Sequence, residues 1–263
     1  MDTIIDSDSV DMGSIPVRDT IFLIGGVIMF DFTERTELLI GSENVKRLEK
    51  ASVLIFGVGG VGSYCVEALA RAGIGRFTLF DGDVVSKSNI NRQLIALHST
   101  EGMFKCEVAR RRILDINPEA KVEIFNEFYT LDNANCIEFS GFDYVADAID
   151  MISSKLLIVE KAKKAEVPVI CAMGAGNRLD PTSFMVTDIY KTKDCPLARI
   201  MRRELRKKNI SDLKVVFSSE NPYREFNKTA DSQKNVIASI SFVPSAEGLV
   251  MASEIIKDII SLP

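Results

Sequence analysis

Histidine is almost absent from this sequence: His98 is the only one among 263 residues. Catalysis by a histidine base, or a metal site with several histidine ligands, is therefore not expected. Cysteine is also scarce and scattered without a CxxC pair, so the common zinc-ribbon spacing is missing and we expect no zinc. An odd, dispersed set of cysteines is typical of reduced thiols in a cytoplasmic protein. The five are Cys65, Cys106, Cys136, Cys171 and Cys195.

The sequence also lacks a long apolar run and an excess of positive charge. Near its start the longest apolar stretch, Ile21 to Phe30, is far shorter than the roughly 20 residues that span a bilayer. The acidic segment before it does not have the basic region of a secretory signal. Residues 1–28 carry no motif, so we treat them as an N-terminal extension and hypothesise that the native chain begins at Met29, which N-terminal analysis would test. The net charge of −5 argues against a broadly basic nucleic-acid binder but leaves a local basic patch open.

Strand and helix patterns alternate between residues 38 and 172. Short apolar runs indicate buried parallel strands, and the segments between them repeat apolar residues at helical spacing. Repeated strand–helix units predict an α/β fold with a doubly wound, Rossmann-like, mainly parallel sheet. The expected strands are 52–56, 76–80, 122–125, 142–146 and 167–172, and the expected helices are 37–50, 62–72, 105–116 and 153–165.

After Gly176 the pattern changes, which predicts a C-terminal α+β extension that completes the fold. We therefore divide the chain into an N-terminal extension (1–28), a nucleotide-binding domain (29–176) and a C-terminal extension (177–263). The polar stretch 221–235 has few core residues and indicates a mobile loop. The other expected elements are strands at 183–190, 214–218 and 236–242, a basic helix at 196–208 and a final helix at 246–260.

A glycine-rich turn, Gly57-Val58-Gly59-Gly60-Val61-Gly62, follows the first of these strands. Glycine lets the backbone turn sharply and approach a ligand, and the helix N-terminus that follows offers N–H groups and a positive dipole to phosphate. Asp81 comes 19 residues after Gly62, at the end of the second strand, where an acid can accept hydrogen bonds from ribose hydroxyls. By itself the pattern fits a dinucleotide cofactor as well as ATP, or a glycine turn without a ligand.

Polar and charged residues beyond the glycine turn favour ATP. They supply carboxylates, an amide, a guanidinium and an ammonium near the carboxyl ends of strands, where such sheets bind ligands. Cations can neutralise a triphosphate, and a carboxylate after the fourth strand can hold Mg²⁺. Each residue alone could be a solvated surface charge, but hydride transfer needs no such cationic set. The residues are Asp81, Asp83, Ser88, Asn89, Arg92, Lys105, Asp147 and Asp150.

Together with the glycine turn, the motifs Ser88-Asn89-x-x-Arg92-Gln93 and Asp147-x-x-Asp150 resemble those of the ubiquitin-activating-enzyme superfamily over residues 33–176. The resemblance implies that residues 29–176 form an ATP-binding adenylation domain, which activates a carboxylate. An asparagine of that family is replaced here by Met151, so its polar contact is absent.

The same resemblance implies roles for individual residues. ATP contacts are implied for Gly57, Gly59, Gly60 and Gly62 and for the eight polar residues given above. Arg92, Lys105 and Asp150 are implied to be catalytic, with Asp150 holding the Mg²⁺ that accompanies ATP. A homodimer is also implied, in which a catalytic Arg35 reaches the phosphates in the partner's site.

The identity of the carboxylate depends on the C-terminal part of the chain. Superfamily members that adenylate sulfur-carrier proteins usually carry two CxxC pairs, which this chain lacks. Instead, segments such as Met173-Gly174-Ala175-Gly176-Asn177-Arg178 and Asp194-Cys195-Pro196-Leu197-Ala198-Arg199 resemble the tRNA threonylcarbamoyladenosine dehydratases, and the likeness then covers nearly all of residues 30–260. The alternative is an adenylyltransferase for a small ubiquitin-like sulfur carrier.

The resemblance to the dehydratases implies a substrate and partners. The substrate is N6-threonylcarbamoyladenosine at position 37 of tRNA, whose carboxylate is adenylated by ATP before the side chain cyclises with net loss of water. The implied partners are tRNA, a second copy of the chain, and a sulfur-relay or cysteine desulfurase protein.

Two features of the C-terminal part stay open at the level of sequence. Cys195 lies where related enzymes place a cysteine that forms a thioester, but cyclisation needs no enzyme nucleophile, and a helix-start cysteine without a covalent role fits equally. The basic helix is either a solvated face or a phosphate-binding surface for tRNA. Its candidate tRNA-binding residues are Arg199, Arg202, Arg203 and Arg206.

Overall fold

The computed structural model describes residues 22–24, 27–29, 32–223 and 237–262. A seven-stranded sheet in the order β5-β4-β3-β6-β7-β9-β8 lies at its centre. All neighbouring strands are parallel except β8 and β9, which confirms the mainly parallel α/β fold. The strands are β3 (Ser52–Phe56), β4 (Arg76–Phe80), β5 (Lys121–Phe125), β6 (Tyr144–Asp147), β7 (Val169–Ala172), β8 (Phe184–Asp188) and β9 (Lys214–Ser218).

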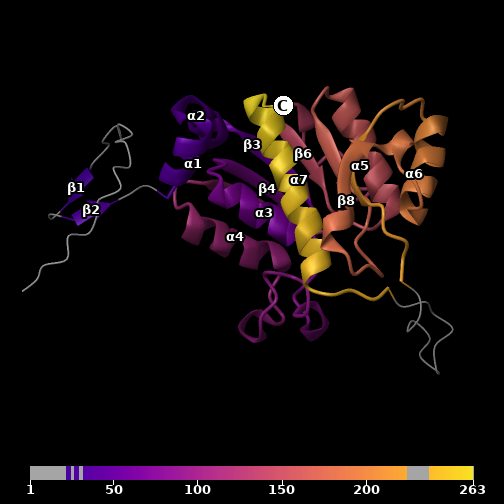
Figure 1. The fold of residues 1–263 in the computed structure, drawn as a ribbon, viewed down its shortest axis with the longest axis horizontal. Coiled ribbons are helices and arrows are strands. Elements are labelled where there is room, and N and C mark those ends of the chain that lie inside the picture. The colour runs from indigo at the N-terminus through magenta and orange to yellow at the C-terminus, as the bar shows by residue number, and fades with distance from the viewer. Residues whose placement is uncertain (1–21, 25–26, 30–31, 224–236, 263) are drawn as a thin grey trace, which may run out of the picture.

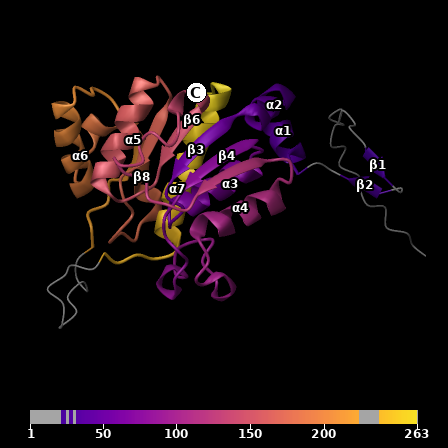
Figure 2. The ribbon, with the colours of Figure 1, turned by 180° about the vertical axis from the view of Figure 1, so that it is seen from behind.

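Helices cover both faces of this sheet, as Figures 1 and 2 show from opposite sides. One face carries α3 (Gly62–Arg71), α4 (Lys105–Ile116) and α7 (Phe242–Ile260), and the other carries α5 (Ile152–Lys164) and α6 (Pro196–Lys207). Strand β3 explains the two layers, because Val53 and Ile55 join one core while Leu54 and Phe56 join the other. A strand buried on both faces is apolar throughout.

The C-terminal part of the chain enters the same sheet. Strand β9 lies between β7 and β8, and helix α7 packs along α3. This helix contact is close at Gly248, where an added Cβ would lie 2.3 Å from the carbonyl oxygen of Val61. The residues after Gly176 therefore complete both the sheet and the helical layers on its two faces.

The helix expected over 37–50 is two helices, α1 (Glu34–Ile40) and α2 (Ser42–Lys50). The break lies at Gly41, whose φ of +84° lies outside helical values. Its N–H still donates to Glu37 O at 2.7 Å, which closes α1 before the chain turns into α2. The prediction was wrong because one glycine in an apolar helical pattern is compatible with either outcome.

The strand expected over 236–242 was also wrong. Among the described residues of this segment, 237–240 have no regular structure and α7 begins at Phe242. The backbone of Ala238 pairs with Asn177 instead of a sheet edge: Asn177 N–H donates to Ala238 O at 2.8 Å, and Ala238 N–H donates to Asn177 Oδ1 at 2.8 Å. Of the mobile loop expected over 221–235, only 221–223 lie within the described residues.

Two short strands precede the sheet. Strands β1 (Phe22–Ile24) and β2 (Val27–Met29) pair antiparallel in a separate hairpin that the sequence pattern did not predict. In the described part of the chain, no helix has the length and apolarity needed to cross a membrane.

Candidate ATP-binding and adenylation site

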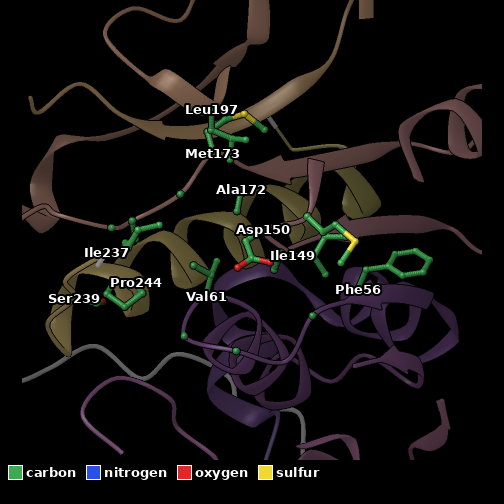
Figure 3. Close-up of a pocket in the computed structure, with 18 of the residues that line it drawn as sticks. Phe56, Val61, Ile149, Asp150, Ala172, Met173, Leu197, Ile237, Ser239 and Pro244 are labelled. Carbon is green, nitrogen blue, oxygen red and sulfur yellow. The ribbon is translucent and has the colours of Figure 1, made fainter. Parts of the chain in front are cut away.

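A cavity of about 940 Å³ opens at the carboxyl ends of β3, β4, β6 and β7. Strand β3 lies between β4 and β6, so the chain order reverses at this point, which is where open α/β sheets bind ligands. Figure 3 shows Asp150 between Val61 of the glycine turn and Ala172 at the end of β7. The predicted residues that line the cavity are Gly57, Gly59, Gly60, Asp81, Asp83, Asn89, Arg92, Lys105, Asp150 and Cys195.

The glycine turn brings the backbone of β3 and α3 to the cavity. Gly57 has φ +88°, and a Cβ there would lie 2.9 Å from the carbonyl carbon of Ala148. Gly62 does not line the cavity; a Cβ on it would lie 1.8 Å from Gly57 O, so it allows α3 to pack on the turn. No side chain caps the N-terminus of α3, which leaves the helix start available to an anion.

Asp81 holds the turn in place from the end of β4. Its Oδ2 accepts the Val58 N–H at 2.7 Å, and its Oδ1 accepts the Asp83 N–H at 2.9 Å. Burial raises the pKa of Asp81, while nearby Lys105 opposes that rise. The carboxylate thus fixes the glycine turn and also borders the cavity, where a ribose hydroxyl can reach it.

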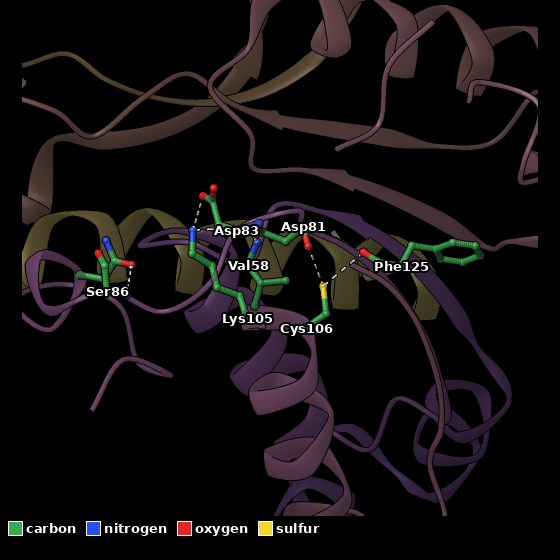
Figure 4. A network of polar contacts seen from close by, with 8 residues as sticks. Val58, Asp81, Asp83, Ser86, Lys105, Cys106 and Phe125 are labelled. Carbon is green, nitrogen blue, oxygen red and sulfur yellow. Dashed lines mark hydrogen bonds and ion pairs between the residues drawn. The ribbon is translucent and has the colours of Figure 1, made fainter. Parts of the chain in front are cut away.

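Lys105 starts α4 and points back to the strand ends, as Figure 4 shows. Its Nζ lies 2.6 Å from Asp83 Oδ2 and 3.8 Å from Asp81 Oδ1. The Lys105 and Asp81 side chains are only 6% and 8% exposed, so water screens this pair weakly, whereas the Asp83 side chain is 53% exposed. This places one cation beside the predicted phosphate position.

Asn89 ends a short 3-10 turn (Lys87–Asn89), and Arg92 follows three residues later; both border the cavity. Arg92 Nη1 donates to Ser88 O at 2.8 Å and to Asn91 Oδ1 at 2.9 Å, which orients the guanidinium. Ser88 does not line the cavity; it supplies this carbonyl, and its hydroxyl contacts Ser86.

The two aspartates after β6 occupy different surroundings. Asp150 is exposed and lines the cavity. Asp147 is fully buried and lies 2.9 Å from the Nζ of Lys155, also fully buried, so it does not reach the cavity. Lys155 further donates to Ile149 O at 3.0 Å, which fixes the loop that carries Asp150.

Similarity to known proteins decides the family. Residues 33–262 match the ThiF family. The chain belongs to the ThiF family. A tRNA threonylcarbamoyladenosine dehydratase of Bacillus subtilis (strain 168) is 40% identical over 237 residues, which cover 86% of this chain and 93% of that protein.

Solved structures agree with this assignment. An E. coli tRNA N6-threonylcarbamoyladenosine dehydratase in complex with ATP superposes with a TM-score of 0.78 at 33% identity. The match covers 86% of this chain and 93% of that chain. The dehydratase sequence of Escherichia coli (strain K12) is 40% identical over 185 residues, 70% of this chain and 68% of that protein. The resemblance seen in the motifs is therefore confirmed.

Cys195 lies at the far side of this ThiF-family cavity, and its side chain is held by backbone groups. The thiol donates to Met173 O and accepts the Ala198 N–H, each at 3.4 Å, so it caps the start of α6. Cys195 is 2% exposed. Burial and the two backbone contacts favour the capping role over that of a nucleophile.

The remaining predicted residues lie away from the cavity. Arg35 is exposed on α1. On α6, Arg202 donates to Thr192 O at 3.2 Å, Arg203 pairs with Glu204 at 2.8 Å and Arg206 lies over the Tyr190 ring, 5.2 Å from its centroid. Arg199 is exposed.

The sequence did not predict several residues that lie at or behind the cavity. Arg178 borders it and is 3% exposed, and Glu247 of α7 is fully buried behind it. Phe128 and Tyr129, which follow β5, border the nucleotide half. For Lys155 and Glu247, the sequence signal is a charged residue inside an apolar helix. Such a residue is expected to have a buried partner, but the sequence does not show which group that partner is.

Proposed function

We propose that this protein catalyses the ATP-dependent dehydration of N6-threonylcarbamoyladenosine at position 37 of tRNA. The observation that carries the proposal is a single cavity in which Arg92, Lys105 and Asp150 border one half and the segment after Gly174 borders the other. Similarity to threonylcarbamoyladenosine dehydratases over most of the chain supports the substrate.

In the first step the substrate carboxylate attacks the α-phosphorus of ATP. An O–P bond forms, the bond to pyrophosphate breaks, and an acyl adenylate results. The glycine turn and the start of α3 bind phosphate oxygens, and Asp81 accepts from the ribose. Arg92 and Lys105 stabilise the charge that builds up on the phosphates.

In the second step the carbamoyl group of the same side chain attacks the acyl carbon. The bond to AMP breaks, a proton is released, and the ring closes, with net loss of water from the side chain. AMP is a good leaving group, and attack within one side chain has a high effective molarity. No enzyme nucleophile is required, in keeping with the hydrogen-bonded thiol of Cys195.

The residues present fit Mg²⁺ together with the phosphates. Asp150 offers an exposed carboxylate at the cavity, and Mg²⁺ in nucleotide sites is commonly held by one or two carboxylates plus phosphate oxygens. Such an ion would neutralise phosphate charge. In the described residues no group of three or more His, Cys, Asp and Glu side chains gathers, so Asp150 would share the ion with ATP.

We further propose that the enzyme works as a homodimer in which Arg35 serves the partner's site. Arg35 lies on α1 next to Leu38 and Leu39, which are 66% and 84% exposed. Arg35 does not line the cavity of its own chain. Exposed apolar side chains beside such an arginine are typical of a contact between subunits.

The tRNA is proposed to approach along α6, where Arg199 and Arg203 are exposed. A tRNA substrate also suits a cytoplasmic enzyme. A sulfur-relay or cysteine desulfurase partner stays a prediction and takes no part in the two steps above. The alternative function is adenylation of a sulfur carrier. That alternative is not favoured, because the chain has no CxxC pair and its relatives in Bacillus subtilis and Escherichia coli, each 40% identical, are dehydratases.

Nucleoside mass spectrometry tests the function. tRNA that carries threonylcarbamoyladenosine is incubated with the protein, ATP and Mg²⁺, and the modified nucleoside should lose the mass of one water. Omission of ATP is the control. An unchanged nucleoside, together with pyrophosphate release that depends on a carrier protein, would favour the alternative.

A further inference from the structure

A buried glutamate on α7 contacts the backbone at the far side of the cavity. Glu247 is fully buried, and its Oε1 accepts the N–H of Met173 at 3.1 Å. The N–H of Gly174 also favours the ionised carboxylate. Met173 and Gly174 follow β7 and begin the loop 173–178, here called the β7 loop, most of which borders the cavity.

The β7 loop is held from both ends. At its start the Met173 N–H is shared between Val216 O on β9 at 2.8 Å and Glu247 Oε1 at 3.1 Å, and the Cys195 thiol donates to the Met173 carbonyl. At its end Arg178 donates to Glu220 O, and Asn177 exchanges two hydrogen bonds with Ala238. Gly174 has φ +95°, so the chain turns sharply where Glu247 holds it. Figure 3 shows Met173 beside Leu197, across the cavity from Val61.

Building on the proposed function, we propose that Glu247 is a positioning residue that holds the β7 loop in place for the threonylcarbamoyl group, and that its ionisation sets how firmly the loop is held. An ionised carboxylate makes stronger hydrogen bonds to backbone N–H groups than a neutral acid does. Glu247 itself does not border the cavity, so it acts through the backbone it holds.

The surroundings of Glu247 allow this ionisation near neutral pH. Burial is the largest influence and raises its pKa to about 7, against the lowering effects of Lys155, the two backbone N–H groups and Arg178. Lys155 on α5 is shared with Asp147 on β6. Burial also keeps the thiols of Cys65 on α3 and Cys171 on β7 protonated. The charge that β9 presents to α7, on Lys214, pairs with Glu254 and Asp258 further along the helix.

The test compares full-length wild type with Glu247→Gln, and uses Glu254→Gln as the matched control on the same helix. Glu254 pairs with Lys257 and Lys214, away from the cavity. For wild type, KM for tRNA should fall as pH rises through about 7. For Glu247→Gln it should stay at the higher value, about threefold to tenfold above wild type at alkaline pH, as expected for one weakened hydrogen bond. KM for ATP should stay unchanged, and Glu254→Gln should match wild type.

Amide hydrogen exchange gives a readout that does not depend on the reaction. Exchange in residues 169–178 should be faster in Glu247→Gln than in wild type, while residues 145–151 and the Glu254→Gln control stay unchanged. Wild-type exchange in residues 169–178 and a wild-type pH profile of KM would overturn the proposal. An inactive wild type would instead overturn the proposed function, and exchange would still decide the role of Glu247.

A second measurement serves if Glu247→Gln does not fold. In the wild-type protein, protection of residues 169–178 relative to residues 145–151 should then increase as pH rises through about 7. A ratio independent of pH would overturn the proposal.

Discussion

Arg92 and Lys105 are the two cations that border the nucleotide half of the cavity, and their local contacts differ. Lys105 is buried between two aspartates, so it also contributes to the position of the glycine turn. The Arg92 guanidinium donates to Ser88 O and Asn91 Oδ1, both within four residues of it in the chain. The guanidinium can therefore turn to phosphate with little cost to the fold.

Arg92→Ala should lower the rate of pyrophosphate release about 100-fold, because one charge-stabilising donor is removed from the adenylation step. Stability should change little. The measurement is ATP-dependent pyrophosphate release, with Arg110→Ala, an exposed arginine on α4, as the control. A rate within threefold of wild type would contradict a phosphate role for Arg92.

Cys195→Ser should retain cyclisation. Serine can donate to Met173 O and accept from the Ala198 N–H as the thiol does, and intramolecular attack needs no acyl-enzyme. Nucleoside mass spectrometry measures the product, and Cys136→Ser, at an exposed position, is the control. Loss of the cyclic product with intact pyrophosphate release would instead show that Cys195 forms a covalent intermediate.

Glu247→Gln should also change how stability depends on pH. The pKa of Glu247 is about 7 when folded, against 4.5 for the free group. Between those values the folded state binds one more proton than the unfolded state, so the free energy of unfolding of wild type falls as pH rises. This loss approaches about 3 kcal/mol above the folded pKa and should be missing in Glu247→Gln. Urea unfolding of both proteins measures it, and parallel pH profiles would contradict it.

Helix α6 carries a cluster of arginines, but not all of them are available to contact tRNA. Arg202 is half-buried and caps carbonyl groups, and Arg206 lies over Tyr190. Of the four candidate arginines, only Arg199 and Arg203 are exposed without a backbone or ring contact of this kind, although Arg203 pairs with Glu204. The surface that α6 offers for the proposed tRNA binding is therefore narrower than its sequence predicts.

Joint replacement of Arg199 and Arg203 by alanine should weaken tRNA binding and reduce the slope of log affinity against log salt by about two, one for each phosphate contact. Arg202→Ala should instead lower Tm, because it removes hydrogen bonds within the fold. Filter binding over a salt series measures the slope. Arg71→Ala on α3, an exposed arginine that pairs with Glu67, is the control. An unchanged slope in the double variant would place the tRNA elsewhere.

At the scale of the whole molecule, the cavity at the strand ends is the proposed site for both substrates, and Arg35 on α1 is not among the described residues that line it. If Arg35 acts in the partner's site, two inactive variants should restore each other. A mixed dimer of Arg35→Ala and Arg92→Ala has one intact site, so random mixing should recover about a quarter of wild-type activity. Activity of the mixture no higher than that of either variant alone would contradict a role for Arg35 between subunits.

Local patterns identified much of the fold and the nucleotide half of the cavity. Strands β3, β4 and β9 and helix α4 have the bounds that apolar runs and helical spacing predict, since burial on both faces leaves a continuous apolar strand. The prediction failed where the local sequence was compatible with two different structures. Gly41 could continue a helix or end it, and the segment predicted as a strand over 236–242 instead pairs through Ala238 with Asn177, outside the sheet.

By itself the sequence determined the sheet, the glycine turn, the chemical character of the nucleotide half and the lack of paired cysteines, because these depend on short segments and on composition. Only the tertiary structure decided which charges face the cavity. In the structure Asp147 pairs with Lys155, Arg202 donates a hydrogen bond to a backbone carbonyl, and Glu247 accepts a hydrogen bond from the start of the β7 loop. Those assignments depend on how separate helices, strands and loops pack together, and a buried charge is stable only where the packing supplies a partner for it.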